Sequence, residues 1–200
     1  GIPQVRHFTA AIADELASYD VEEVHLDFIR YPFRTFGYTQ AALHEYRRWL
    51  RAVNLKDTEE NFDRFRIEST GEQVRLIREK VRSRGKKLSC AVFDDYSERA
   101  VKERLQPWLG WLEDGLIDSA VVMAYGREPD GVISRVENIC NIHGSLKGIR
   151  VGLGAFNYAG RWDDFIGLVK RVRKMDPDEI TFFALSSIDE ELAGKLKALD

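Results

Sequence analysis

The stretch EVHLDFIRYP, residues 23–32, decides the fold, because it has the pattern of a buried strand that ends in polar groups. Three apolar residues alternate with two polar ones: Val24, Leu26 and Phe28 against His25 and Asp27. A strand therefore places the apolar side chains on one face and the imidazole and carboxylate on the other. Pro32 prevents further ladder pairing. We expect Asp27 to be either an active-site carboxylate or half of a structural ion pair with Arg30.

Helices and strands alternate along the whole chain. Strands are expected at residues 23–32, 87–96, 117–125, 149–156 and 179–185, with helical patterns between them. Short connections without a Pro- or Gly-rich linker favour one parallel α/β domain over residues 1–200. A polar group follows each strand, which favours a barrel rim over an open sheet. No dinucleotide fingerprint, Walker loop, nucleophile elbow or zinc-binding helix is present in its usual setting.

Two of the predicted helices have clear signals. An amphipathic helix over residues 3–19 has its apolar positions at helical spacing: Val5, Phe8, Ile12 and Leu16. The Ser187 to Glu190 spacing is a capping-box signature for the last helix. A further helical stretch at residues 58–84 is expected to be interrupted near Gly71.

Composition excludes some classes of function. The chain has 200 residues, a formal net charge of -3 and no long basic run, so nucleic acid is a poor candidate partner. No apolar stretch has the length of a membrane span. Two cysteines and no spaced ligand set predict neither a disulfide framework nor a metal site, and no cofactor is expected.

Residues 19–32, YDVEEVHLDFIRYP, resemble the Tyr-x-Val-Asp-Gly-Ile-His-Phe-Asp-Tyr-Ile-Arg-Tyr-Pro signature of the bacterial glycosyl-hydrolase-like family ten. Three further segments resemble that family's motifs: residues 65–68, 88–93 and 108–125. Departures include Glu22-Glu23 for Asp-Gly and Val122-Met123 for Pro-Gln. The family consists of glycosidases built on a TIM barrel.

This resemblance implies that the strands are the fourth to the eighth of an eight-stranded barrel. The chain would then be a partial (β/α) barrel without its first three strands. An N-terminal half-barrel or self-association would cover the open sheet edge. The resemblance also implies an extracytoplasmic, bacterial protein acting on a glycan.

Glycosidic cleavage needs two carboxyl groups, one of them a proton donor. Asp27 is the first candidate. The phase of Ser89, Ala91 and Phe93 along the next strand brings Asp95 to the same inward side, which makes it the second. An alternative for Asp94 and Asp95 is a helix N-terminus, where carboxylates satisfy backbone N–H groups.

The candidate substrate-binding residues lie in or after the strands. They are His25, Arg30, Tyr31, Asp94, Tyr125, Glu128, Asn157 and Trp162. The aromatic ones either stack on sugar rings or pack on the rim. His25 either orients Asp27, binds a substrate hydroxyl, or is a satisfied core residue. Glu128 is a further candidate proton donor.

The function expected is a polysaccharide hydrolase that uses two carboxyl groups for acid and base catalysis. A non-catalytic glycan-binding barrel is the alternative. A barrel lyase or aldolase ranks third, because it needs a lysine at a strand end and no lysine stands at such an exit.

Overall fold

The computed structural model describes residues 2–96, 101 and 103–199, and its chain divides into two compact units. The first comprises Gly1–Ala91 and Tyr96–Asp118, and the second Val92–Asp95 and Ser119–Asp200. The expected single domain over residues 1–200 remains a prediction, and each unit is described by itself.

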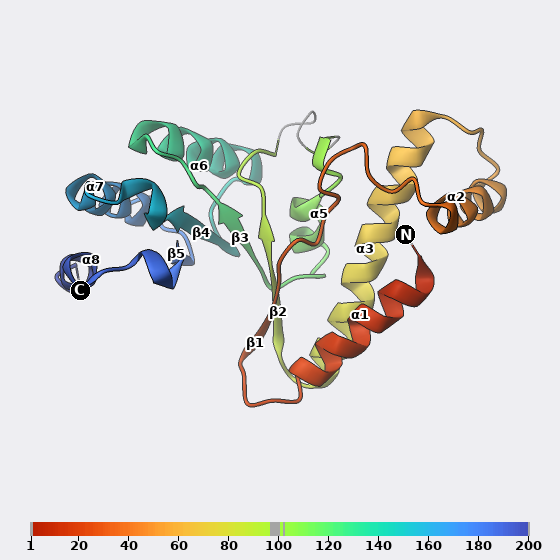
Figure 1. Ribbon diagram of the computed structural model, residues 1–200, viewed down its shortest axis with the longest axis horizontal. Coiled ribbons are helices and arrows are strands. Elements are labelled where there is room, and N and C mark those ends of the chain that lie inside the picture. Colours follow the sequence, from red (N-terminus) through yellow and green to blue (C-terminus); the bar gives the residue numbers. More distant parts are fainter. Residues whose placement is uncertain (1, 97–100, 102, 200) are drawn as a thin grey trace. The chain divides into compact units, whose positions relative to one another are not determined.

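The first unit contains two parallel strands and the helices beside them (Figure 1). Its elements are α1 (Pro3–Leu16), β1 (Glu23–Leu26), α2 (Gln40–Val53), α3 (Glu59–Ser83), β2 (Lys87–Val92, without its last residue) and α5 (Trp108–Glu113). Val24 pairs with Leu88, and His25 with Ser89. Leu88, like Val74, Ile77 and Val81 of α3, is completely buried. These side chains form the core of the unit.

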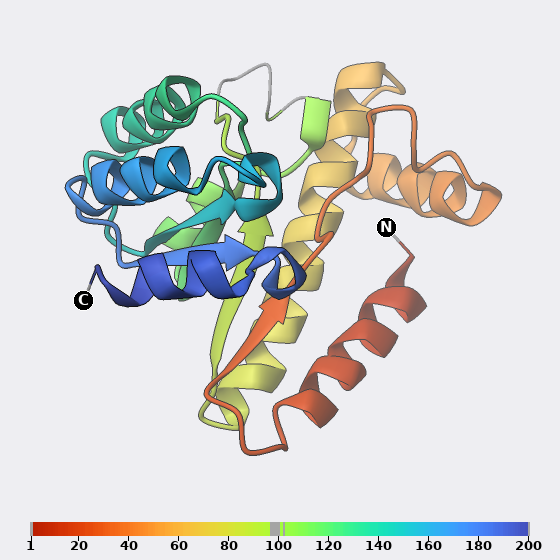
Figure 2. The same ribbon diagram turned by 60° about the vertical axis from the view of Figure 1, so that its left-hand side comes forward.

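The second unit continues the strand-helix order (Figure 2). Its elements are β3 (Ser119–Met123), α6 (Pro129–His143), β4 (Ile149–Gly154), η1 (Ala155–Tyr158), α7 (Trp162–Arg173), β5 (Glu179–Phe183), η2 (Leu185–Ser187) and α8 (Glu190–Lys197). Strand β4 pairs in parallel with β3 and with β5. All five predicted strands and their order are therefore found.

Helix α1 lies beside α3 (Figures 1 and 2), but its buried face is not the expected one. Ala10, Ala13 and Ala17 are at most 3% exposed. Small side chains allow the two helices to approach closely. The four larger apolar residues, Val5, Phe8, Ile12 and Leu16, are 44–68% exposed and form what we call the α1 stripe.

Two other local predictions are wrong. Helix α3 runs through Gly71 without interruption. The cap of α8 is Asp189, whose Oδ1 accepts a hydrogen bond from the Leu192 N–H at 2.8 Å, whereas Ser187 belongs to η2. The aspartate caps the helix as the serine was expected to do, but two residues later, so the backbone donor that it satisfies is the Leu192 N–H and not the Glu190 N–H.

Candidate functional site

Strand β1 ends earlier than the sequence suggested, and its end exposes Asp27. The ladder stops at Leu26, and Asp27 Oδ1 accepts a hydrogen bond from the Phe28 N–H at 2.8 Å. Phe28 has φ 56° and is 70% exposed, so it does not continue the buried apolar face as predicted. The left-handed turn ends the strand phase, because a strand cannot continue through that conformation.

Arg30 and Tyr31 follow this turn. The Arg30 guanidinium lies 4.8 Å from the centre of the Phe28 ring. Burial and the nearby Arg104 lower the pKa of Arg30, while Asp27 acts in the opposite direction. Burial also raises the pKa of Tyr31. Asp27 and Arg30 are therefore within electrostatic range of each other.

A cavity of about 230 Å³ lies beside this strand end. It is lined by Phe28, Ile29, Arg30, Tyr31, Ser69, Thr70 and Gln73. Hydroxyl, amide and guanidinium side chains, together with two aromatic rings, thus line a hollow beside the turn that follows β1.

The loop after β1 is held by Arg66, whose role the sequence did not reveal. Arg66 is 1% exposed and pairs with Asp63 of the same helix. Its Nη1 donates to the carbonyl oxygens of Arg34 and Phe36, at 2.5 and 2.7 Å. The loop aromatics, including Phe33 at 59%, remain exposed on this anchored backbone.

The His25 side chain on β1 is exposed, so it is not a core histidine. Its Nδ1 is 2.8 Å from Ser89 Oγ, and that hydroxyl donates to Glu23 Oε1 at 2.6 Å. Ser89 is completely buried. Neither Glu23 nor Ser89 was predicted as a site residue.

The carboxylates after β2 differ from each other. Asp94 Oδ2 accepts a hydrogen bond from Arg135 Nε at 2.5 Å, so this side chain is in an ion pair with α6. Asp95 is exposed three residues after the strand. The alternative role of both residues at a helix N-terminus concerns residues 97–100, which lie outside the described part of the chain.

Three aromatic rings meet at the carboxyl ends of β3, β4 and β5. Tyr125 stacks on Phe183 with ring centres 5.4 Å apart, and Phe156 contacts both at 5.8 and 6.3 Å. Phe156 is 47% exposed and Phe183 52%. We call these three residues the aromatic cluster. Only Tyr125 was predicted as a site residue.

Glycines in β4 make room for this cluster. Gly154 lies opposite Phe183 in the sheet, and a Cβ on it would stand 2.9 Å from the Phe156 ring and 3.2 Å from Asn157 Nδ2. A Cβ on Gly152 would lie 3.5 Å from the Tyr125 ring. The small residues therefore let side chains fold back over the strand end. Asn157 is half-buried beside them.

Glu128 and Trp162 complete the predicted set. Glu128 is exposed at the start of α6. Trp162 is only 7% exposed, and its Nε1 donates to Asp189 Oδ2 at 3.1 Å. Because so little of its ring reaches the surface, the alternative of packing at the rim fits Trp162 better than stacking on a sugar ring.

Within residues 2–96, 101 and 103–199, no group of three or more His, Cys, Asp or Glu side chains is placed to hold a metal ion. None of the helices in this described part is long and apolar enough to cross a bilayer.

The chain was found to be similar to a protein family by its sequence and to solved structures by its fold. The family model described as glycosyl hydrolase-like 10 matches residues 1–138. No curated protein matches the sequence.

Two solved structures share its fold. The PgaB (BpsB) glycoside hydrolase domain from Bordetella bronchiseptica has a TM-score of 0.75 at 11% identity, over 96% of this chain and 61% of that domain. A GH18 chitinase from Pseudoalteromonas aurantia has a TM-score of 0.58 at 19% identity, over 98% and 68%. This chain thus spans less than two thirds of the first domain. The likeness confirms the predicted fold class, parallel strand-helix units of the TIM-barrel type.

Proposed function

Because the chain belongs to the glycosyl hydrolase-like 10 family, as its motifs predicted, we propose that it hydrolyses glycosidic bonds in a polysaccharide. The observation that carries this proposal is that, within each unit, exposed carboxyl or aromatic groups follow directly after parallel strands. Asp27 follows β1, and the aromatic cluster follows β3, β4 and β5. In barrel enzymes this end of the strands is where catalysis takes place.

We assign the two carboxyl roles to Asp27 and Asp95, both of which are exposed. One protonates the leaving oxygen, and the other attacks the sugar or activates water. Asp94 is less suited, because its carboxylate is already engaged in the ion pair with Arg135. Glu128 stays a second candidate for the proton donor.

The substrate we propose is a bacterial cell-wall or extracellular glycan, which places the protein outside the cytoplasm. The aromatic cluster offers exposed ring faces for the apolar C–H faces of sugar rings. The polar cavity beside Arg30 and Tyr31 suits the hydroxyl groups. Both features match an uncharged or weakly charged polysaccharide better than a compact phosphorylated metabolite.

A further part of a barrel, or a second copy of the chain, is the partner we propose for the α1 stripe. Its four exposed apolar side chains make a continuous helix face of the kind that is usually covered. The chain spans 61% of the Bordetella domain, so additional strand-helix units are the first candidate.

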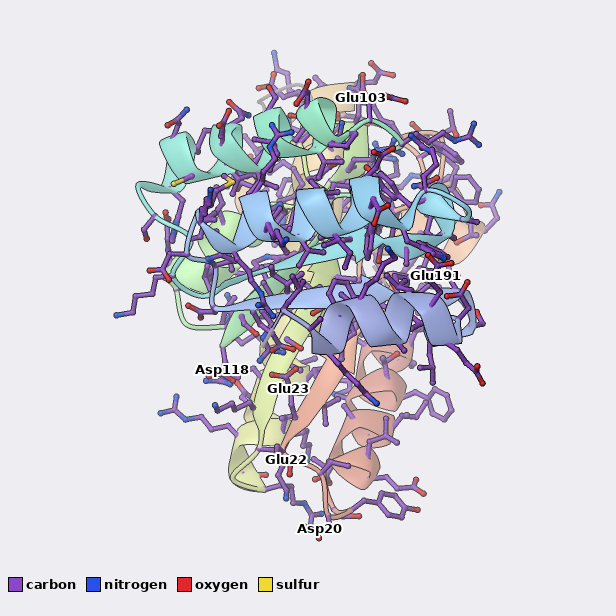
Figure 3. The ribbon with its side chains drawn as sticks, turned by 90° about the vertical axis from the view of Figure 1, so that its left-hand side faces the viewer. Asp20, Glu22, Glu23, Glu103, Asp118 and Glu191 are labelled. Carbon is purple, nitrogen blue, oxygen red and sulfur yellow. The ribbon has the colours of Figure 1, made fainter. Side chains whose placement is uncertain are left out.

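The test is release of reducing ends from a panel of bacterial glycans by the parent, Asp27→Asn and Asp95→Asn. Each substitution should lower the rate at least about a hundredfold while the protein stays folded. Asp20→Asn is the matched control, because Asp20 is exposed before the start of β1 (Figure 3). Glycan binding without turnover by the parent would refute the hydrolase and favour the non-catalytic binding barrel.

A further inference from the structure

Glu23, Ser89 and His25 form a hydrogen-bonded chain across β1 and β2. His25 pairs with Ser89 in the ladder, and Glu23 lies two residues earlier on the same face of β1, where Figure 3 labels it. The Ser89 hydroxyl bridges the two, at 2.6 Å from Glu23 Oε1 and 2.8 Å from His25 Nδ1. All three groups belong to the first unit.

The chain of bonds fixes where the protons lie. An ionised carboxylate only accepts hydrogen bonds, so the single Ser89 proton points to Glu23. The Ser89 oxygen must then accept from His25, which requires a proton on Nδ1. In the neutral ring the lone pair is consequently on Nε2.

A nucleophilic serine triad has a different order. There the imidazole lies between the serine and the carboxylate and takes the serine proton. Here the serine lies in the middle and donates to the carboxylate. Ser89 is also completely buried, so its oxygen cannot reach a substrate. The arrangement therefore positions His25 and does not activate Ser89.

We propose that Glu23 and Ser89 are positioning residues that hold His25 in the Nδ1–H tautomer, so that Nε2 accepts a hydrogen bond from a sugar hydroxyl beside Asp27. This role rests on the proposed glycan substrate. Glu23 stands where the motif that this segment resembles has glycine, so the motif itself does not supply this carboxylate. His25 is exposed and two residues before Asp27, as such a contact requires.

The tautomer is measured directly by ¹H–¹⁵N correlation of the four histidine rings at about pH 8.5, where ordinary histidines are neutral. His25 is assigned by the signal lost in His25→Gln. His143 is an internal reference, because its Nδ1 is 2.9 Å from the Ser145 carbonyl, which only accepts. We expect the Nδ1–H pattern for His25 in the parent and a shift toward Nε2–H in Ser89→Ala.

Ser119→Ala is the matched control. Ser119 is 4% exposed, and within the described part of the chain its hydroxyl has no hydrogen-bond partner. This variant removes an equally buried serine hydroxyl without touching His25. Its His25 signals should be unchanged.

Three results would overturn the proposal. The first is an Nε2–H pattern in the parent, which needs no variant to interpret. The second is an unchanged His25 tautomer in folded Ser89→Ala. The third is full glycan hydrolysis by Ser89→Ala, for which we expect about a tenfold loss against an active parent, the value of one hydrogen bond. A parent that hydrolyses nothing refutes the proposed function, and the ring signals still decide the tautomer.

Discussion

Replacing Asp118 by asparagine tests the hydrogen bonds through which this residue links α3 to β2. Asp118 accepts two hydrogen bonds from the Arg78 guanidinium, one of them at 2.9 Å, and one from the Leu88 N–H at 2.7 Å. Burial opposes ionisation, but Arg78 and the Leu88 N–H hold the pKa of Asp118 below its ordinary value. The carboxylate therefore stabilises the folded chain in its charged form.

The expected loss in Asp118→Asn follows from these bonds. A hydrogen bond to a charged group contributes roughly 1.5–3 kcal/mol, and an exposed ion pair roughly 0–1. The Asp118 side chain is 32% exposed, so we expect its ion pair with Arg78 to contribute roughly 0–1 kcal/mol, as exposed pairs do. Asparagine keeps one acceptor oxygen but turns an NH₂ group toward Arg78. We expect the free energy of unfolding to fall by about 2 kcal/mol at pH 7.

The sign of the pH dependence is set by the lowered pKa. A carboxyl whose folded pKa lies below its unfolded value of about 3.9 stabilises the fold above that pH, and this contribution is lost as the pH falls through the folded pKa. Urea unfolding of parent and Asp118→Asn should therefore differ equally at pH 7 and 5 and converge below about pH 4. The control is Asp114→Asn, four residues away and exposed. The same difference at pH 3 as at pH 7, or an equal loss in the control, would refute this reasoning.

Three further predictions follow from other parts of the structure. Burial raises the pKa of Cys90 to about 12, so at pH 8 a thiol reagent should modify half-buried Cys140 in the folded chain and Cys90 only after unfolding. Arg66→Met should lower the free energy of unfolding by about 3 kcal/mol, because it leaves the buried Asp63 carboxylate with one partner fewer. It should also speed amide exchange in the loop over residues 33–38, whose carbonyls Arg66 holds, and unchanged loop exchange would contradict this. Gly154→Ala should shift the Phe156 ring, which would alter the near-ultraviolet circular dichroism and weaken glycan binding. The free energy of unfolding should change by less than about 1.5 kcal/mol, because the ring can rotate away. An unchanged spectrum would show that the aromatic cluster does not need the glycine.

The order of helices and strands could be predicted because it depends on local periodicity. Apolar runs of strand length separated by helical patterns leave few alternatives to a parallel strand-helix fold. The end of β1 could not, because it depends on one side chain. Asp27 folds back on the Phe28 N–H, and Phe28 then takes a left-handed conformation that no alternation of apolar residues reveals.

The face of α1 was mispredicted for a related reason. Helical spacing selects Val5, Phe8, Ile12 and Leu16, but the alanines on the other side allow a closer approach to α3. Periodicity measures which side is apolar and not which side has a partner.

Site residues that directly follow one predicted strand could be predicted from their place in the sequence. Asp27 and Tyr125 were predicted because polar or aromatic residues follow apolar runs. Phe156 and Phe183 fall inside the strands predicted at 149–156 and 179–185, and nothing in the sequence shows that they meet, because their contact depends on the register of neighbouring strands. Arg66 lies in the segment 65–68 that resembles a family motif, but its structural role was not predicted, because a buried arginine that holds loop carbonyls resembles any other arginine on an amphipathic helix.

The alanine contact of α1 has a consequence for local opening of the chain. Methyl groups bury little area, so α1 gains less from its packing than a helix held by leucines, and its amides should exchange early through partial unfolding. A molecule that binds the α1 stripe only in the packed state would raise the free energy of this local unfolding, by about 2.7 kcal/mol when its concentration is a hundred times its dissociation constant. Slowed amide exchange confined to Pro3–Leu16 would then report that the α1 stripe is occupied, whether or not the protein hydrolyses a glycan.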